Sequence, residues 1–553
     1  MEGPFNKTVT RNITIYDQLS YVSLSHSSIL QAKLPLLVIF FFQFKLIIKY
    51  IFQKNKRSSA VRAPLPPGPS PMWPILGCVP HMLRNRPAYR WIHRLMKQLN
   101  TDIACFRLVG NSHVIAVTSP EIAREFLKKH DAVFALRPET MATCIVSKGY
   151  LTTALCPGGE QWKKMRRILA SHVLSPSTMR WLLDMRNQEA DNLVRYLYNQ
   201  CSKNLKGDVV NVRTAAQHYP ANAMRRMMFG RRYFGKGRAD GGPGLEEEEH
   251  VSSFFTMLLH IYAFSVSDYF PWLKSLDLDG HRKKVCDAVK VVDKYHDPII
   301  ADRIQEWREG KKTQPEDLLD VLISLKDSNG NPLLSKDEIR AKITEIFIET
   351  VDNPYNAAEW ALSEMINQPN LIEKAVEELD RVVGKDRLLQ ESDIPHLPYA
   401  VACAREALRL HPMAPFNVPH VSSADCTVAG YFIPKGSSVL LSRLGLGRNP
   451  NVWDDPLRFD PERHLPEGHV DLVETELRFI SFTRGRRGCV GAGLGSNLTV
   501  MLLGRLLQGF TWSIPVGVEK IDLCADADSL LKATPLFAHA KPRLNPSVYM
   551  SLL

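Results

Sequence analysis

The stretch that decides the fold is "FISFTRGRRGCVGAGLG", residues 479–495. It contains a single cysteine, Cys489, which is flanked by glycines and preceded by Arg486 and Arg487. An apolar run with helical spacing follows at residues 494–507. A cysteine that stands just before a helix and beside arginines is expected to have a lowered pKa, so we expect Cys489 to be a thiolate.

The glycines around Cys489 would let a flat ligand approach the backbone closely, because glycine has no side chain to obstruct it. A thiolate, a flat ligand and arginines that can meet acidic groups together suggest haem, whose iron a cysteine can hold. A cysteine among glycines is, however, more often part of a tight turn. The loop alone therefore leaves both interpretations open.

Size and composition are those of a folded protein with a large core. The chain has 553 residues, 45% hydrophobic and 23% charged, and shows no internal repeat. Its net charge is +12, but its basic residues are not interleaved with aromatic ones, so we expect no nucleic-acid partner. An anionic membrane face or an acidic protein would attract this charge. The ten cysteines are spread singly, which argues against a zinc ribbon or disulfide framework and for a reducing compartment.

The N-terminal part predicts a membrane anchor. Residues 34–52 are hydrophobic over about the length that a spanning helix needs, and three basic residues follow them. The positive-inside rule then places the bulk of the chain in the cytosol. A cleaved signal peptide is the alternative, but the apolar core is too long and no cleavage site follows. We therefore predict a lumenal tail, transmembrane anchor and basic flank at 1–62, and a catalytic domain at 63–553.

Two glycosylation sequons begin at Asn6 and Asn12 and would face the lumen, so both asparagines are candidates for glycosylation. A proline-rich strap at 63–77 should be stiff and extended. The remainder is mainly helical in pattern, with strand-like runs at 102–119, at 426–442 and near the C-terminus.

Five residues of the cysteine loop, Phe482, Gly485, Arg487, Cys489 and Gly491, stand at the spacing F-x-x-G-x-R-x-C-x-G. This pattern resembles the haem-binding loop of cytochrome P-450 monooxygenases. The resemblance implies a haem cofactor, with Cys489 as the iron ligand and with Phe482, Arg487 and Gly491 in contact with the haem.

Three further segments resemble this family in its own order. Glu406 and Arg409 in "REALRLHP" match its E-x-x-R helix, whose spacing puts both charges on one face. Arg463 in "FDPERHL" matches the third member of that buried ion network. Trp162 and Arg166 in "QWKKMRR" match the helix that contacts a haem propionate. The resemblance implies the cytochrome P-450 fold, mainly α with smaller β-sheets, behind the anchor helix.

The stretch "ETVDNPYN" aligns with the family's distal helix, where a bend opens a groove for dioxygen and where an acid and an alcohol deliver protons. Asp352 keeps the acid, Asn353 stands where the threonine usually is, and Pro354 follows. Because proline removes an amide donor and crowds the preceding turn, we expect the helix to break at Pro354. The resemblance gives Asp352, Asn353 and Pro354 catalytic roles.

The replaced alcohol, together with "LHPMAPFNVPH" at 410–420, resembles one plant branch of the family, the amino-acid N-monooxygenases that make aldoximes. In that branch His420 takes the place of an arginine that meets a propionate. The resemblance implies double N-hydroxylation of a free, hydrophobic amino acid with O2, in the biosynthesis of glucosinolates or cyanogenic glucosides. No dinucleotide or flavin fingerprint is present, so electrons should come from NADPH through NADPH-cytochrome P-450 reductase at the endoplasmic reticulum membrane.

The chain departs from this branch at four positions. Glu349 and Thr350 stand where small residues are usual, Tyr355 is bulkier than the common serine, and Arg484 replaces a small residue. A carboxylate over a haem is costly unless it is paired. Glu349 therefore either turns away from the pocket or meets a cationic substrate.

Two other functions remain as alternatives. One is a carbon hydroxylase of plant secondary metabolism, against which the missing alcohol argues. The other is a membrane haem protein without turnover, against which Asp352 argues. The substrate pocket should be built partly from residues 141–155 and from the helix around Phe347, a mixture that leaves leucine-like and phenylalanine-like substrates open.

Overall fold

The computed structural model describes residues 63–70, 72–203 and 209–552. The chain divides into two units, and the described residues all belong to the second, Ala63–Leu553. The predicted anchor at 34–52 and the two sequons lie outside the described residues. Within the described part, none of the helices is both long enough and apolar enough to span a bilayer.

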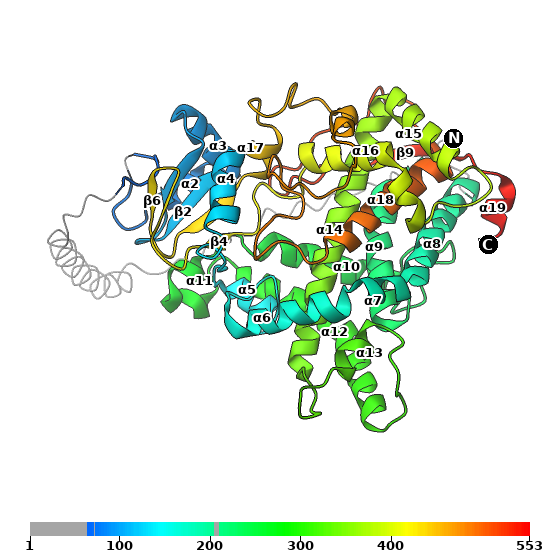
Figure 1. Cartoon of the computed structure of the whole chain (residues 1–553), viewed down its shortest axis with the longest axis horizontal. Helices are drawn as coiled ribbons and strands as arrows, with labels where there is room; N and C mark the ends of the chain where they lie inside the picture. Colours follow the sequence, from blue (N-terminus) through cyan, green and yellow to red (C-terminus); the bar gives the residue numbers. More distant parts are fainter. Residues whose placement is uncertain (1–62, 71, 204–208, 553) are drawn as a thin grey trace, which may run out of the picture. The chain divides into compact units, whose positions relative to one another are not determined.

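The long helix α14, Lys336–Asn367, runs through the core of this unit (Figure 1). It begins with a capping box formed by Ser335 and Glu338, which satisfies backbone donors at the helix start. Nearly all residues after Glu338 are buried, so α14 has no solvent-facing side over most of its length. The helices that pack on it include α9 (Val212–Phe229), α10 (Leu245–His260), α16 (Pro398–Leu410) and α18 (Ala492–Gly509).

The other α-helices of the described residues are, in chain order, α2 (Val79–Arg84), α3 (Ala88–Gln98), α4 (Pro120–Arg124), α5 (Met141–Val146), α6 (Gly159–Ile168), α7 (Pro176–Trp181), α8 (Leu183–Lys203), α11 (Val266–Tyr269), α12 (His281–Arg308), α13 (Leu318–Ser324), α15 (Pro369–Val382), α17 (Arg443–Gly447) and α19 (Pro546–Met550). Short π-helical or 3-10 turns are η1 (Glu125–Lys129), η2 (Leu169–Val173), η3 (Pro271–Leu276), η4 (Glu391–His396) and η5 (Pro461–Glu467).

Three small sheets accompany the helices. The first has the order β1 (Ile103–Arg107), β2 (His113–Val117), β7 (Ser438–Leu441) and β4 (His420–Val421), with β2 and β7 parallel. The second has the order β3 (Val209–Asn211), β9 (Phe537–Pro542) and β8 (Phe510–Ser513), and the third pairs β5 (Cys426–Val428) with β6 (Tyr431–Ile433). The prediction of a mainly helical fold with strands at 102–119, at 426–442 and near the C-terminus is confirmed.

The prediction that α14 breaks at Pro354 is wrong, because the helix continues through Pro354 to Asn367. A proline removes only one hydrogen bond of the helix, and packing of buried residues on both sides of it stabilises the rest. The carbonyl of Thr350 still lacks the donor that residue 354 would otherwise supply. The Thr350 hydroxyl meanwhile donates to the carbonyl of Ile346 at 2.7 Å.

Candidate functional site

The cysteine loop is held by its own backbone. The N–H of Cys489 donates to the carbonyl of Phe482 at 3.0 Å. Gly485 has a φ of +79°, and a Cβ there would lie 2.4 Å from the Oδ1 of Asp131 and 2.7 Å from the carbonyl of Leu127. Only glycine fits this close approach without a shift of its neighbours. The loop thus presents the Cys489 side chain, which is accessible to solvent.

The predicted lowering of the Cys489 pKa is wrong: burial, and next Glu349, raise the pKa of this thiol to about 12. Burial and solvent access are compatible when the thiol faces a hollow within the protein. The neighbouring arginines have other partners, since Arg486 faces Asp131 at 3.6 Å and Arg487 is bonded to backbone carbonyls. The thiol is therefore neutral here, and coordination to a metal is what would deprotonate it.

Arg487 ties the cysteine loop to an earlier part of the chain. Its guanidinium donates to the carbonyls of Ala135 at 2.6 Å, Thr153 at 3.1 Å and Pro157 at 2.5 Å. Burial, and next Arg137, lower the pKa of Arg487 to about 9. Three of its N–H groups are used in this way, and an arginine has five in all, so the side chain can still donate to a ligand.

Helix α6 brings Trp162 and Arg166 to the same loop. Arg166 donates to the carbonyl of Gly488 at 3.0 Å. The guanidinium of Arg487 lies 4.6 Å from the centre of the Trp162 ring, and that of Arg166 lies 5.9 Å from it, both within cation–π range. The indole Nε1 of Trp162 is buried and has no hydrogen-bond partner among the described residues.

His420 and Arg137 meet at the end of β4. The Nδ1 of His420 lies 2.8 Å from the carbonyl of Phe134, so this nitrogen carries the proton that it donates. Burial, and next Arg137, hold the pKa of His420 well below its ordinary value. Arg137 is buried and donates to the carbonyls of Val418 and Pro419. Arg137 is not predicted from the sequence, because the surrounding "ALRPET" has no pattern that marks a buried arginine.

These groups fit a haem. Trp162 Nε1, Arg137 Nε and His420 Nε2 are buried nitrogens that find no partner in the described part of the chain. Haem carries two carboxylates, and charge-assisted hydrogen bonds to carboxylates are what such nitrogens can supply. His420 must first gain a proton on Nε2, which a nearby carboxylate would favour. The accessible Cys489 thiol supplies the iron ligand that such a group requires.

The distal residues lie on α14. Asp352 is buried, and its Oδ1 has no hydrogen-bond partner within the described chain. Burial raises the pKa of Asp352 to about 7, although the positive charge of Arg443 acts to lower it. Arg443, on α17, is also buried, and burial lowers its pKa to about 10. Asn353 is half-buried, and the buried Tyr355 packs its ring edge-on against Phe255 at 5.4 Å. Arg443 is not predicted from the sequence either, because it lies 91 positions after Asp352.

Two further predictions concern α14. The prediction that the helix around Phe347 helps to build the pocket stays a prediction; Phe347 itself stacks on Phe229 at 5.8 Å and on Phe254 at 5.6 Å in the core. Glu349 does not turn away toward the outer surface, since it is near enough to raise the pKa of Cys489. Burial raises the pKa of Glu349 itself to about 8.

The ion network of α16 is complete in the structure. Glu406 accepts from Arg409 at 2.7 Å and from Arg463 at 3.1 Å, and His464, which the sequence analysis missed, lies 2.9 Å away. Burial alone would raise the pKa of Glu406, but hydrogen bonds from Arg409 and His464 lower it to about 2. Arg409 also donates to the carbonyls of Gly447 and Pro456. The network therefore positions loops and does not touch the cysteine.

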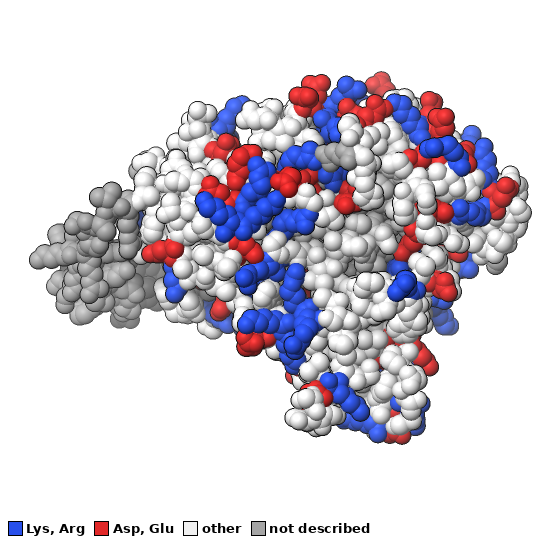
Figure 2. All heavy atoms as spheres, in the orientation of Figure 1, with Lys and Arg blue, Asp and Glu red and all other residues white. Residues whose placement is uncertain are grey.

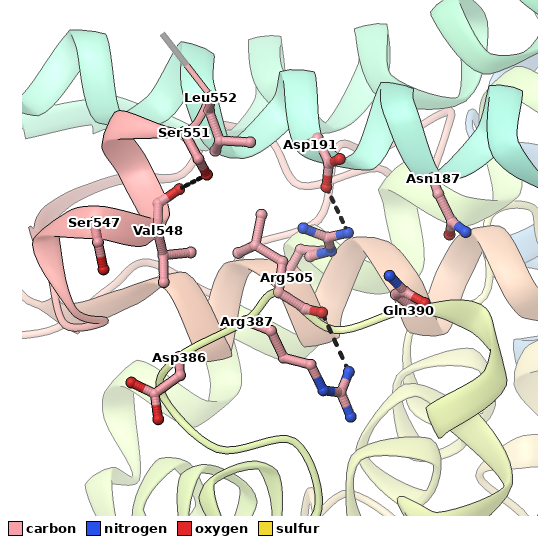
Figure 3. A pocket seen from close by; sticks show the side chains of 11 residues that line it. Asn187, Asp191, Asp386, Arg387, Gln390, Arg505, Ser547, Val548, Ser551 and Leu552 are labelled. Atoms are coloured by element: carbon pink, nitrogen blue, oxygen red, sulfur yellow. Dashed lines mark hydrogen bonds and ion pairs between the residues drawn. The ribbon is translucent and has the colours of Figure 1, made fainter.

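A cavity of about 420 Å³ lies elsewhere, between α8, α18, α19 and the segment at 386–390 (Figure 3). Arg505 projects into it and pairs with Asp191 at 2.8 Å. None of the residues predicted for the site lines this cavity. A second cavity, of about 390 Å³, lies between α9 and α10. Neither belongs to the cysteine site.

Comparison with known proteins agrees with this geometry. The sequence model of the family described as cytochrome P-450 matches residues 66–539. The chain is 63% identical over 512 residues to tryptophan N-monooxygenase of Prunus mume, covering 92% of this chain and 96% of that protein. It is 58% identical over 518 residues to isoleucine N-monooxygenase 1 of Lotus japonicus, and this match covers 93% of this chain and 96% of that protein. It is 57% identical over 508 residues to phenylalanine N-monooxygenase of Arabidopsis thaliana, and this match covers 90% of this chain and 96% of that protein.

A solved structure of a zebra fish cytochrome P-450 with progesterone superposes with a TM-score of 0.68 at 23% identity. The match covers 83% of this chain and 100% of that one. At this identity the likeness bears on the fold alone.

Proposed function

This chain belongs to the cytochrome P-450 family, and from that premise we propose that it hydroxylates the nitrogen of a free, hydrophobic amino acid twice to give an aldoxime. Membership of the family implies a haem whose iron is held by a cysteine thiolate, and Cys489 is the residue at that position. The observation that carries the substrate class is 63% identity over 92% of the chain to a tryptophan N-monooxygenase.

The relatives support the nitrogen as the site of reaction. Their names give tryptophan, isoleucine, valine, phenylalanine and tyrosine as substrates, each paired with N-monooxygenase. These side chains differ in size and polarity, and what the substrates share is the α-ammonium and α-carboxylate. Hydrophobic amino acids are therefore the proposed substrate class. The test below identifies which side chain the substrate carries.

The residues of the site have separate tasks in this proposal. Bound haem supplies the activation of dioxygen and the transfer of one oxygen atom. Cys489 would hold the iron, and Trp162, Arg137 and His420, whose buried nitrogens lack partners in the described chain, would hold the carboxylates. Asp352 can hold or release a proton near neutral pH, because its pKa is about 7. Two oxygen insertions at nitrogen, followed by loss of carbon dioxide and water, leave the aldoxime.

Electrons would come from NADPH-cytochrome P-450 reductase. Figure 2 shows Lys and Arg side chains gathered on the face that carries α4 and α6. Exposed members near the cysteine loop are Lys128, Lys129, Lys163, Arg167 and Arg486. A surface of this sign attracts an acidic partner and speeds its association, which supports docking of a reductase beside Cys489.

We also place the protein at the endoplasmic reticulum membrane, with the catalytic unit in the cytosol. The hydrophobic segment at 34–52 and the basic residues after it support this orientation. Trp272 is 71% exposed and Leu276 and Leu278 are each 62% exposed, an apolar group that suits contact with a membrane surface.

The test is expression of the full chain with the reductase, followed by feeding of each protein amino acid and detection of its aldoxime. We expect an aldoxime from one or a few hydrophobic amino acids, and none from a Cys489→Ser variant. A product hydroxylated on carbon, with its amine intact, would indicate a carbon hydroxylase instead. A substrate-induced change in the haem spectrum without NADPH consumption would indicate a binding protein.

A further inference from the structure

Glu349 interrupts the buried run of α14. The residues before it from 341 to 348 are buried, as are Val351 and Asp352 after it, yet the Glu349 side chain is accessible to solvent. Accessible positions in the middle of a core helix mark an opening inside the protein.

The opening is the hollow that Cys489 also faces. Burial is the main cause that raises the pKa of Glu349, which places the carboxyl deep in the protein and not on its outer surface. Glu349 in turn raises the pKa of Cys489, and it also acts on Arg166 and Arg137. The carboxyl therefore lies between α14 and the residues that fit the haem.

The nearby cations are already engaged. Lys342 pairs with Glu345 and bonds the hydroxyl of Thr153 at 2.5 Å. Arg166 and Arg137 donate to backbone carbonyls, and their remaining N–H groups suit haem carboxylates. Glu349 itself makes no hydrogen bond or ion pair with any residue that the structure describes. The hollow thus contains a carboxyl on which Lys342, Arg137 and Arg166 act only from a distance, without an ion pair in the described chain.

We propose that Glu349 binds the α-ammonium group of the amino-acid substrate, an assignment that rests on the function proposed above. An ammonium offers three donors, and two kinds of acceptor stand together here. One is the Glu349 carboxylate, and the other is the carbonyl of Thr350, which Pro354 leaves without its helical donor. Glu349 and Asp352 are three residues apart and so lie on one face of α14.

This arrangement would hold the substrate nitrogen beside the proton-carrying Asp352. It would also favour the ionised form of Glu349, since a cation close to a carboxyl lowers the pKa of that carboxyl. Because Glu349 would meet the substrate and not the iron, it should add affinity and selectivity for the ammonium group. It should not be required for haem binding.

The test compares Glu349→Gln with the wild-type holoenzyme by titration of the haem spectrum. The probes are tryptophan, isoleucine, valine, phenylalanine and tyrosine, each paired with the 2-hydroxy acid that lacks the ammonium group. We expect the dissociation constant of the amino acid to rise about tenfold in the variant, equivalent to about 1.4 kcal/mol. The dissociation constant of the hydroxy acid should be unchanged. Asp337→Asn, which removes an exposed charge from the start of α14, is the matched control.

The outcomes separate this inference from the proposed function. If no hydrophobic protein amino acid, the five probes included, shifts the wild-type spectrum, the proposed function fails before the variant is considered. If an amino acid binds and the glutamine variant binds it as tightly or more tightly, only the role of Glu349 is overturned. Glu349→Ala, which removes the carboxyl altogether, serves the same comparison should the glutamine variant not retain haem.

Discussion

The cysteine loop and the distal part of α14 face the same hollow, but they are built differently. In the loop, backbone hydrogen bonds and the fit of Gly485 hold Cys489 in place. On α14, the Oδ1 of Asp352 is buried without a partner in the described chain. The loop is therefore a fixed support for the cofactor, whereas the distal face keeps polar groups available for substrate, water and protons.

The largest effect should follow from changing the metal ligand of the fixed region. Cys489→Ser should abolish the red-shifted carbon-monoxide band typical of thiolate-ligated haem and all turnover. The fold should survive, because the backbone bonds of the loop do not need the sulfur. The band is measured in the carbon-monoxide difference spectrum and the fold by circular dichroism. Cys524→Ser, at an exposed cysteine, is the control and should behave as wild type.

The next largest effect should come from the distal acid. Asp352→Asn should lower kcat roughly 100-fold, the lower end of what a general acid or base contributes, while the haem spectrum stays unchanged. Only protonated Asp352 can donate, and its pKa is about 7, so wild-type kcat should fall as pH rises through 7. In the asparagine variant this descending limb of the kcat–pH profile should disappear. An unchanged limb would show that Asp352 is not the donor.

A change in the glycine backbone of the loop should have a moderate effect. Gly485→Ala should destabilise the protein by roughly 1–3 kcal/mol, since a side chain at its positive φ is strained and would meet Asp131. Gly493→Ala is the matched control, because a Cβ there has no atom within 4 Å. Denaturant unfolding of both variants measures the difference. Equal stabilities would mean that the loop is not fixed by its glycines.

The smallest effect should come from the arginine that faces the distal acid. The positive charge of Arg443 lowers the pKa of Asp352. Tyr355 is a second titratable group near Asp352, whose charge raises the pKa of this tyrosine. Arg443→Gln should therefore move the descending limb of the kcat profile to higher pH by a fraction of a unit, whereas Arg443→Lys should restore it. A shift in the opposite direction would contradict the assignment.

The two regions also differ in how far the sequence predicts them. The spacing around Cys489 and the E-x-x-R pair are local patterns, and the structure brings their members together. The predicted direction of the Cys489 pKa shift is wrong because the fold buries the thiol and brings Glu349, 140 positions earlier, close to it. Arg137 and Arg443 were missed for the same reason, since burial beside a distant residue leaves no local pattern. The continuity of α14 through Pro354 likewise depends on packing and not on propensity.

The most direct test of the account is the position of the oxygen atom that the enzyme transfers. The holoenzyme with reductase and NADPH is supplied with its amino acid under isotopically labelled dioxygen, and the products are identified by mass spectrometry. The account predicts an aldoxime that carries one labelled oxygen on nitrogen, with the carboxylate lost as carbon dioxide. A labelled hydroxyl on carbon, in a product that retains its amine and carboxylate, would contradict it.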